Sequence, residues 1–179
     1  MTELWRKTAR EMVALLAKGE VRPTEAVDAA AERIEATNGA VNAMVTLCLE
    51  RAKDAAALIE SKGHPENPGP GYLYGLPISV KDLNDVASVR CTLGSPIYAD
   101  RIATESDFMV QTLEANGAIV IGKSNTPEFG AGANTFNEVF GSTRNPWDTR
   151  MNCGGSSGGA AVNLATGQTW LATGSDLGG

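Results

Sequence analysis

The chain has 179 residues, of which 42% are hydrophobic and 20% are charged, and its formal net charge is −6. This composition is typical of a globular domain with a real core, and the negative balance, without any run of Lys or Arg, argues against a nucleic-acid partner. The three cysteines lie far apart and form no Cys-x-x-Cys pair, so we expect neither a zinc site nor a disulfide framework. No apolar run approaches the roughly 18 residues needed to span a bilayer. We therefore expect a cytoplasmic protein that uses no membrane contact, no metal and no other cofactor.

The first third of the chain has the apolar periodicity of helices. The expected elements are a helix over residues 3–18 ended by Gly19, a helix that opens after Pro23 with Thr24 as its N-cap and ends near Gly39, and a helix over residues 47–62. A loop rich in Gly and Pro follows at residues 63–71. We therefore expect residues 1–62 to form a helical lead-in.

Strands and helices alternate in the rest of the chain. The expected elements are a short strand over 76–81, a helix over 106–116 with Ser106 as its N-cap, a buried strand over 118–121, a helix over 157–166 and a strand over 168–173. This order predicts an α/β fold with helices packed on a sheet, of which residues 63–179 supply the first part.

Residues 117–124 match the phosphate-binding loop pattern Gly-x4-Gly-Lys-Ser literally, from Gly117 to Ser124. That loop needs four central residues whose amides turn toward a phosphate. Here those four are Ala-Ile-Val-Ile, which predict a buried strand. A nucleotide-binding module is therefore a disfavoured alternative from another functional class.

Serine side chains are candidates for nucleophilic catalysis, but a serine needs a base to remove its proton. The only histidine, His64, lies in the Gly- and Pro-rich loop, where we interpret it as a solvated residue. A lysine can serve as the base if burial lowers its pKa. Lys81, at the end of an apolar strand, has a suitable position for this role.

Most of the 20 glycines lie after residue 116, and several flank serines. Such clusters indicate sharp turns or close backbone approach. Ser156 and Ser157 could simply cap the helix over 157–166, as serine often does. Cys153 borders the same segment, but without a nearby histidine we do not expect it to be a nucleophile.

Five segments, taken together, are much more specific than any one of them. The chain resembles the amidase signature family in the order and spacing of residues 75–82, 122–129, 143–148, 154–159 and 174–179. The resemblance runs from about Gly75 to the end of the chain. It implies an α/β/α fold with a mixed central sheet, of which only the N-terminal part is present, and a Ser–cis-Ser–Lys triad that hydrolyses carboxamides through an acyl-enzyme.

The resemblance also assigns roles to individual residues. Lys81 matches the catalytic base, and Ser156 matches the bridging serine that follows a cis peptide bond. Ser157 is expected in the same hydrogen-bond network. The family's nucleophilic serine directly follows the last Gly-Gly pair, which is position 180, outside the given sequence. We therefore expect these residues to be the N-terminal portion of a longer enzyme.

The last residues of the chain are expected to stabilise the oxyanion. The resemblance places the backbone N–H groups of Leu177, Gly178 and Gly179 around the developing negative charge. It also suggests that Gly130 lies on the acyl side of the substrate pocket.

The resemblance leads to an amidohydrolase that cleaves the C–N bond of a small carboxamide, and it allows a homodimer. The alternative within the family is the amidase-type subunit of a tRNA-dependent amidotransferase, which would need partner subunits. Residues 80–85 and 124–129 look more like those of stand-alone amidases. The identity of the substrate is not encoded in a recognisable motif.

Overall fold

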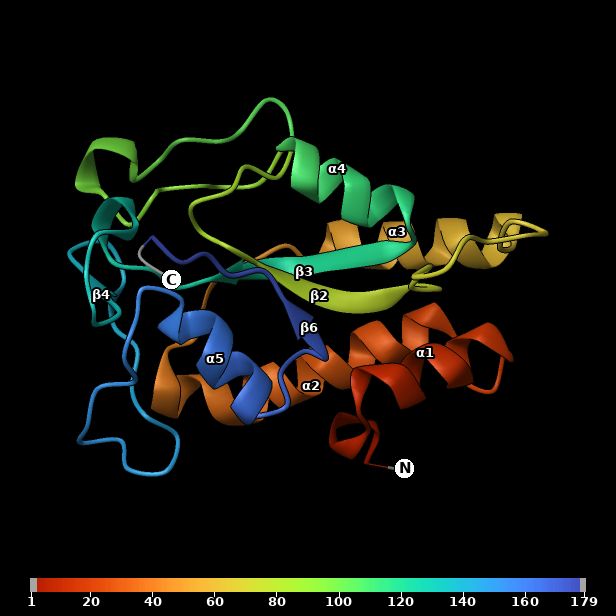
Figure 1. The fold of residues 1–179 in the computed structure, drawn as a ribbon, viewed down its shortest axis with the longest axis horizontal. Helices are drawn as coiled ribbons and strands as arrows, with labels where there is room; N and C mark the ends of the chain where they lie inside the picture. Colours follow the sequence, from red (N-terminus) through yellow and green to blue (C-terminus); the bar gives the residue numbers. More distant parts are fainter. Residues whose placement is uncertain (1–2, 178–179) are drawn as a thin grey trace.

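The computed structural model describes residues 3–177, and Figure 1 shows their helices packed around short central strands. In chain order the elements are η1 (Leu4–Arg6), α1 (Ala9–Ala17), α2 (Pro23–Val41), β1 (Met44–Leu47), α3 (Leu49–Lys62), β2 (Leu76–Lys81), η2 (Pro96–Tyr98), α4 (Phe108–Ala115), β3 (Ala118–Ser124), η3 (Glu128–Gly130), β4 (Phe136–Asn137), β5 (Gly141–Ser142), α5 (Gly158–Ala165) and β6 (Leu171–Ala172). None of the helices within residues 3–177 combines the length and the apolar composition needed to cross a bilayer.

Four strands form the main sheet, in the order β1-β3-β2-β6. β1 runs antiparallel to β3, whereas β2 is parallel to both β3 and β6. In Figure 1, α4 lies above this sheet and α1, α2 and α5 lie below it. The predicted α/β class and the mixed sheet are therefore confirmed.

The first helix is shorter than predicted. Residues 3–18 contain the single turn η1 and then α1, which are separated because Thr8 leaves the helical conformation to cap α1. The Thr8 hydroxyl accepts from the Glu11 N–H, and the Glu11 carboxylate accepts from the Thr8 N–H. This reciprocal capping box fixes the start of α1 at Ala9.

The second helix also differs from the prediction at both ends. Its N-cap is Arg22 rather than Thr24, and the Thr24 hydroxyl instead donates to Glu60 of α3. The helix continues past Gly39 to Val41 and ends where Asn42 adopts φ 51°. A glycine inside a helix is tolerated at modest cost, so Gly39 was an unreliable stop signal.

Strand β1 was not predicted, because four residues are too few for a clear periodicity. Its place is set by backbone hydrogen bonding to the edge of β3, and the Cys48 N–H extends this pairing by donating to the Ile121 carbonyl. The third helix therefore starts at Leu49 rather than at residue 47.

Three later elements begin or end at residues other than those predicted. The N-cap of α4 is Asp107, because the Ser106 hydroxyl accepts from the Ala87 N–H instead of capping the helix. Strand β3 continues beyond residue 121 to Ser124 along its parallel partner β2. Strand β6 is shorter than residues 168–173, because the Gln168 N–H closes the end of α5 by donating to the Asn163 carbonyl.

The two larger clusters of buried hydrophobic side chains lie on the two faces of the sheet. One cluster joins α1, α2 and α3 to Ile119 and Ile121 of β3. The other packs Val110 of α4 against Ile78, Val80 and Val120. Strands β2 and β3 are buried along their whole length, which positions the carboxyl end of β2 inside the protein.

Lys123, the lysine of the literal phosphate-loop pattern, forms a buried ion pair. Residues 118–124 are strand β3, and the Lys123 ammonium lies 3.0 Å from Oδ1 of Asp82, with both side chains fully buried. Asp82 also accepts from the Thr92 hydroxyl and N–H. Because its backbone is a strand and its lysine is already paired, the nucleotide-binding interpretation is wrong.

Replacement of Lys123 by methionine is expected to lower the free energy of unfolding by about 3–5 kcal/mol, because it leaves the Asp82 carboxylate buried without its cation. Urea unfolding measures the change. The matched control is Lys53→Met, which removes an exposed lysine and should change stability little. Equal effects of the two substitutions would contradict the importance of the buried pair.

Candidate active site

Lys81 ends strand β2 and extends its ammonium group into a set of serine hydroxyls. Its Nζ donates to Oγ of Ser156 at 2.7 Å, of Ser157 at 3.0 Å and of Ser175 at 2.9 Å. The Lys81 residue is fully buried, and its N–H donates to the Thr173 hydroxyl beside β6. The three serines come from two segments far from β2 in the sequence, so tertiary structure alone brings this cluster together.

Burial lowers the pKa of the Lys81 amine below its ordinary value, because the charged ammonium loses hydration in this environment. Its three side-chain partners are neutral hydroxyls, which stabilise an ammonium less than a carboxylate would. The amine therefore loses its proton at a lower pH than an exposed lysine would, and only the neutral amine can accept a proton.

Ser156 and Ser157 lie directly before α5, where the sequence left a capping role open. Ser157 is the N-cap residue of α5, but its side chain makes no capping hydrogen bond. Instead its hydroxyl donates to the Ser175 carbonyl and accepts from the Ser175 N–H. The peptide bond between Gly155 and Ser156 is cis, as the resemblance implied. The two hydroxyls thus face the lysine rather than the helix.

Sequence reasoning assigned no role to Ser175, although its hydroxyl is as close to Lys81 as that of Ser157. It follows β6, which is parallel to β2, so both strands end on the same side of the sheet. The signal that could have found it is its place in the segment 174–179, combined with the parallel pairing. That pairing could not be read from the sequence.

Two glycines of the serine segment allow the start of α5 to approach the rest of the site. A Cβ added at Gly159 would lie 2.4 Å from the Asn125 backbone nitrogen, just after β3. One added at Gly158 would lie 2.3 Å from the Thr135 hydroxyl, which accepts from the Gly158 N–H. The close approach indicated by the glycine clustering is therefore confirmed at these positions.

The other predicted site residues are placed as follows. Leu177 is fully exposed, and Gly178 and Gly179 lie outside the described residues. Gly130 ends η3 with φ +70°, and a Cβ there would lie 2.5 Å from a Leu83 methyl carbon. Gly130 therefore packs against the segment that follows Lys81.

His64 lies apart from this cluster, in the loop that precedes β2, whereas Lys81 ends that strand. Its ring packs edge-on against Tyr72 and Tyr74, so it is partly buried rather than solvated as expected. Cys153 donates to the Gly154 carbonyl, and burial raises the pKa of its thiol, which disfavours the reactive thiolate. Neither residue contributes to the lysine cluster.

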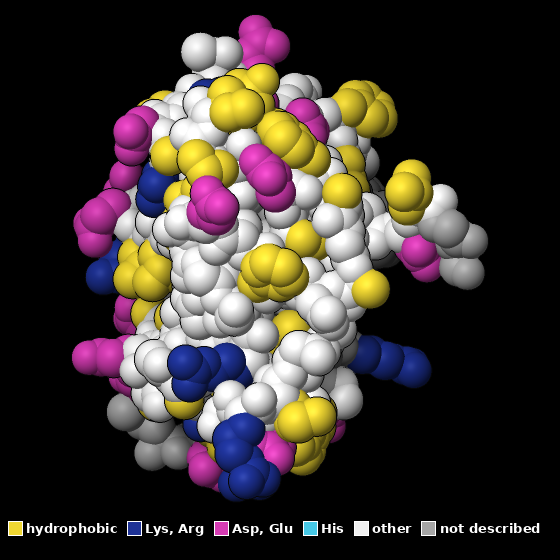
Figure 2. Space-filling view, turned by 90° about the vertical axis from the view of Figure 1, so that its left-hand side faces the viewer, with side chains coloured by type: hydrophobic (Ala, Val, Ile, Leu, Met, Phe, Trp, Pro, Cys, Tyr) yellow, Lys and Arg dark blue, Asp and Glu magenta, His cyan; other side chains and the backbone are white. Residues whose placement is uncertain are grey.

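The end of the molecule at which β2 and β3 finish faces the viewer in Figure 2. Hydrophobic side chains are spread across this face, while most of the visible Lys and Arg side chains gather in its lower part. Several hydrophobic side chains of the loops after β3 are exposed, among them Phe129, Phe136 and Trp147. The segments that follow β3 therefore expose apolar side chains to solvent.

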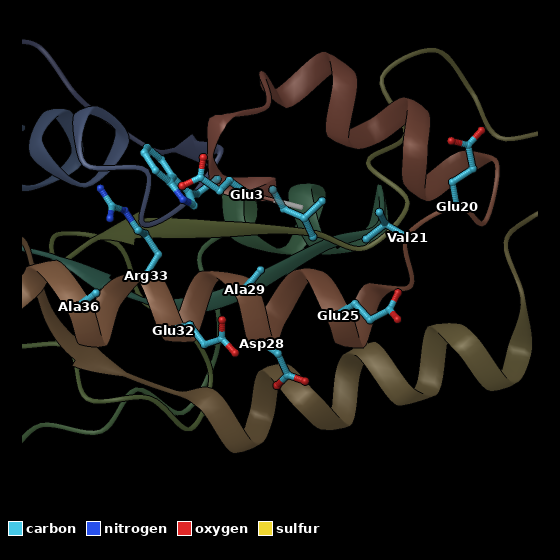
Figure 3. A pocket seen from close by; sticks show the side chains of 11 residues that line it. Glu3, Glu20, Val21, Glu25, Asp28, Ala29, Glu32, Arg33 and Ala36 are labelled. Atoms are coloured by element: carbon cyan, nitrogen blue, oxygen red, sulfur yellow. The ribbon is translucent and has the colours of Figure 1, made fainter. Parts of the chain in front are cut away.

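A separate cavity of about 640 Å³ lies between η1, the turn after α1, and α2 (Figure 3). Its carboxylates are Glu3, Glu20, Glu25, Asp28 and Glu32, and its apolar lining includes Trp5 and Val21. None of its lining residues belongs to the lysine–serine cluster. Within residues 3–177 no group of three or more His, Cys, Asp or Glu side chains is arranged to hold a metal ion.

The structure thus combines a mixed sheet with a buried lysine that is hydrogen-bonded to serine hydroxyls at the end of one strand. This combination defines the class of protein. A family model described as Amidase matches residues 25–179. The chain therefore belongs to the amidase family, whose members carry the amidase signature.

The curated relatives include the A subunits of two bacterial glutamyl-tRNA(Gln) amidotransferases. That of Oleidesulfovibrio alaskensis is 37% identical over 100% of this chain, and that of Moorella thermoacetica is 40% identical over 99%. The chain spans 36% of the length of each of these relatives.

The solved structures that resemble this one include a fatty acid amide hydrolase and a 6-aminohexanoate cyclic dimer hydrolase complexed with substrate. The first is 25% identical with a TM-score of 0.89, and the match covers 98% of this chain and 31% of that one. The second is 29% identical with a TM-score of 0.81, covering 93% and 33% respectively.

Replacement of Gly159 by alanine is expected to lower the free energy of unfolding by about 1–3 kcal/mol, because the new methyl group would overlap the Asn125 backbone. Gly39→Ala, inside helix α2, is the matched control, since apart from the neighbouring backbone of its own helix nothing lies within 4 Å of its added Cβ. There alanine should stabilise by about 0.5–1 kcal/mol. Thermal or urea unfolding measures both changes, and opposite signs are expected.

Proposed function

We propose that this chain is the N-terminal part of a longer amidohydrolase that cleaves a carboxamide through a serine acyl-enzyme. The observation that carries the proposal is the 2.7 Å hydrogen bond between Nζ of buried Lys81 and Oγ of Ser156. Family membership supports it, because amide hydrolases are among the solved structures that resemble the chain. Residues 1–62 belong to the same core rather than to a separate helical lead-in, because β1 pairs with β3 and side chains of α1, α2 and α3 pack against the sheet.

In the proposed reaction the nucleophile is a serine at position 180. Neutral Lys81 accepts the proton of the Ser156 hydroxyl, and Ser156 takes the proton of the nucleophile as it attacks the amide carbonyl. The tetrahedral intermediate then expels the amine, which receives a proton back through Ser156. Water attacks the acyl-enzyme by the same route, and releases the carboxylic acid and the free serine.

The geometry around Lys81 suits this role. Ser157 and Ser175 hold the amine on two further sides, so that Nζ keeps its position opposite Ser156. We assign the backbone N–H groups of Leu177, Gly178 and Gly179 to the oxyanion, and Gly130 to the acyl side of the pocket. All the groups needed are protein groups, so the route requires no cofactor.

The second candidate function is that of an amidase-type subunit in a tRNA-dependent amidotransferase, with partner subunits. The names of the curated relatives favour it, since several are A subunits of glutamyl-tRNA(Gln) amidotransferases. Both candidates use the same lysine–serine cluster. Release of ammonia from simple carboxamides by the full-length protein, without ATP or other subunits, would favour the stand-alone amidase. Hydrolysis that requires added subunits would favour the second candidate.

Replacement of Lys81 by alanine in the full-length protein is expected to lower kcat/KM for amide hydrolysis about 10²–10⁴-fold, because the base is lost. Ammonia release measures the activity, and circular dichroism checks that the fold remains. Lys62→Ala, at the exposed end of α3, is the control and should leave the rate unchanged. Near-normal turnover by the Lys81 variant would refute the assigned base.

The pH dependence follows from the need for a neutral amine. Protonated Lys81 cannot accept a proton, so kcat/KM should rise as the pH rises through the pKa of Lys81 in the free enzyme. Because burial lowers that pKa from its ordinary value of 10.5, the rise should have its midpoint below this value. Lys81→Arg keeps the positive charge at all accessible pH values and should be inactive throughout. A rate that rises only above pH 10.5 would contradict the lowered pKa.

A further inference from the structure

Asn163 is a fully buried amide in the second half of α5, and the proposed reaction gives it no part. Its Nδ2 donates to the Ser79 hydroxyl at 2.6 Å, and its Oδ1 accepts from the Thr169 hydroxyl at 2.7 Å. Nδ2 also lies 3.5 Å from the sulfur of Met44 in β1. One side chain thus links α5 to β2, to β1 and to the segment that leads into β6.

These three contacts converge on the elements that carry the lysine cluster. Ser79 precedes Lys81 by two residues, so both side chains point to the same face of β2. The Ser79 carbonyl accepts from the Thr173 N–H, and the Thr173 hydroxyl in turn accepts from the Lys81 N–H. The network therefore continues from Asn163 to the backbone of the lysine itself.

The helix that carries Asn163 begins with the serines of the cluster. Ser156 and Ser157 precede Gly158, the first residue of α5, and both hydroxyls accept from the Lys81 ammonium. A sideways or axial shift of α5 on the sheet would change these distances directly. An amide anchored to β2 resists such a shift, because sliding would leave a buried donor and a buried acceptor unpaired.

We propose that Asn163 is a positioning residue for the amidase reaction, and that its bonds to Ser79 and Thr169 set the distance between the Lys81 amine and the serines at the start of α5. The proposal rests on the proposed function. Asn163 does not touch the reacting atoms, and acts by fixing α5 and β6 against β2. A displacement of about 1 Å in such a cluster can lower the rate about 100-fold.

The test replaces Asn163 by leucine in the full-length protein, which keeps the side-chain volume but removes both hydrogen bonds. We expect kcat for amide hydrolysis to fall about 10- to 100-fold with KM nearly unchanged. Ser79→Ala should give a loss of the same kind. The double variant Asn163→Leu/Ser79→Ala should be no worse than the poorer single variant, because both remove the same bond.

A second measurement separates positioning from a loss of stability. Titration of the Lys81 ε-amine, followed by NMR of lysine ε-carbons, should move to higher pH in Asn163→Leu, as water reaches the loosened amine. The matched control is Asn38→Ala, which removes another hydrogen-bonded amide, the one that accepts from the Ala43 and Met44 N–H groups. It should lower stability without moving either kcat or the titration.

The outcomes are distinct for the two proposals. A normal kcat and an unmoved Lys81 titration in Asn163→Leu would overturn the positioning role, whatever its effect on stability. If Asn163→Leu does not fold, Ser79→Ala and Thr169→Val provide the same two readouts. Full activity of Lys81→Ala would refute the proposed function instead, and the NMR titration would still decide whether Asn163 sets the environment of Lys81.

Discussion

The structure depends on the burial of one lysine amine among serine hydroxyls. An ammonium group removed from water is costly, and here its side-chain partners are neutral, so burial lowers the pKa of Lys81. Three segments bury the amine at the carboxyl end of β2. They are the start of α5, the segment after β6, and strand β3, which lies alongside β2. Each segment comes from a different part of the chain, so the amine acquires its chemistry only when the sheet is assembled.

The surroundings of Lys81 contain other buried polar groups, and two paired sets among them join the strands and helices of the site. Asp82, which directly follows Lys81, pairs with Lys123 of β3 and accepts from the Thr92 hydroxyl, so it ties the end of β2 to β3 and to the loop that carries Thr92. Asn163 satisfies hydroxyls on two neighbouring segments. Buried hydrogen bonds of this kind favour a single geometry, because moving either partner would leave a buried polar group unpaired. The same hydrogen bonds and ion pair that stabilise the fold therefore keep the side chains of the site in their positions.

Family membership and site geometry contribute different parts of the functional argument. The match over residues 25–179 establishes the amidase family, and the structures that resemble the chain establish the fold. The relatives include both amide hydrolases and amidotransferase subunits, so similarity leaves two functions open. The proposed roles of Lys81 and Ser156 fit either function, so the site geometry does not separate them. What separates them is whether amide hydrolysis needs partner subunits.

The sequence by itself determined the strand 76–81 with Lys81 at its end, the serine pair before α5, and the mixed α/β class. These features depend on local patterns and on motif order, which are visible along the chain. Only the tertiary structure decided that the serines face the lysine rather than cap the helix, that Ser175 joins them, and that β1 extends the sheet. The physical reason is that hydrogen-bond partners far apart in the sequence are chosen by sheet pairing and burial, which no local periodicity records.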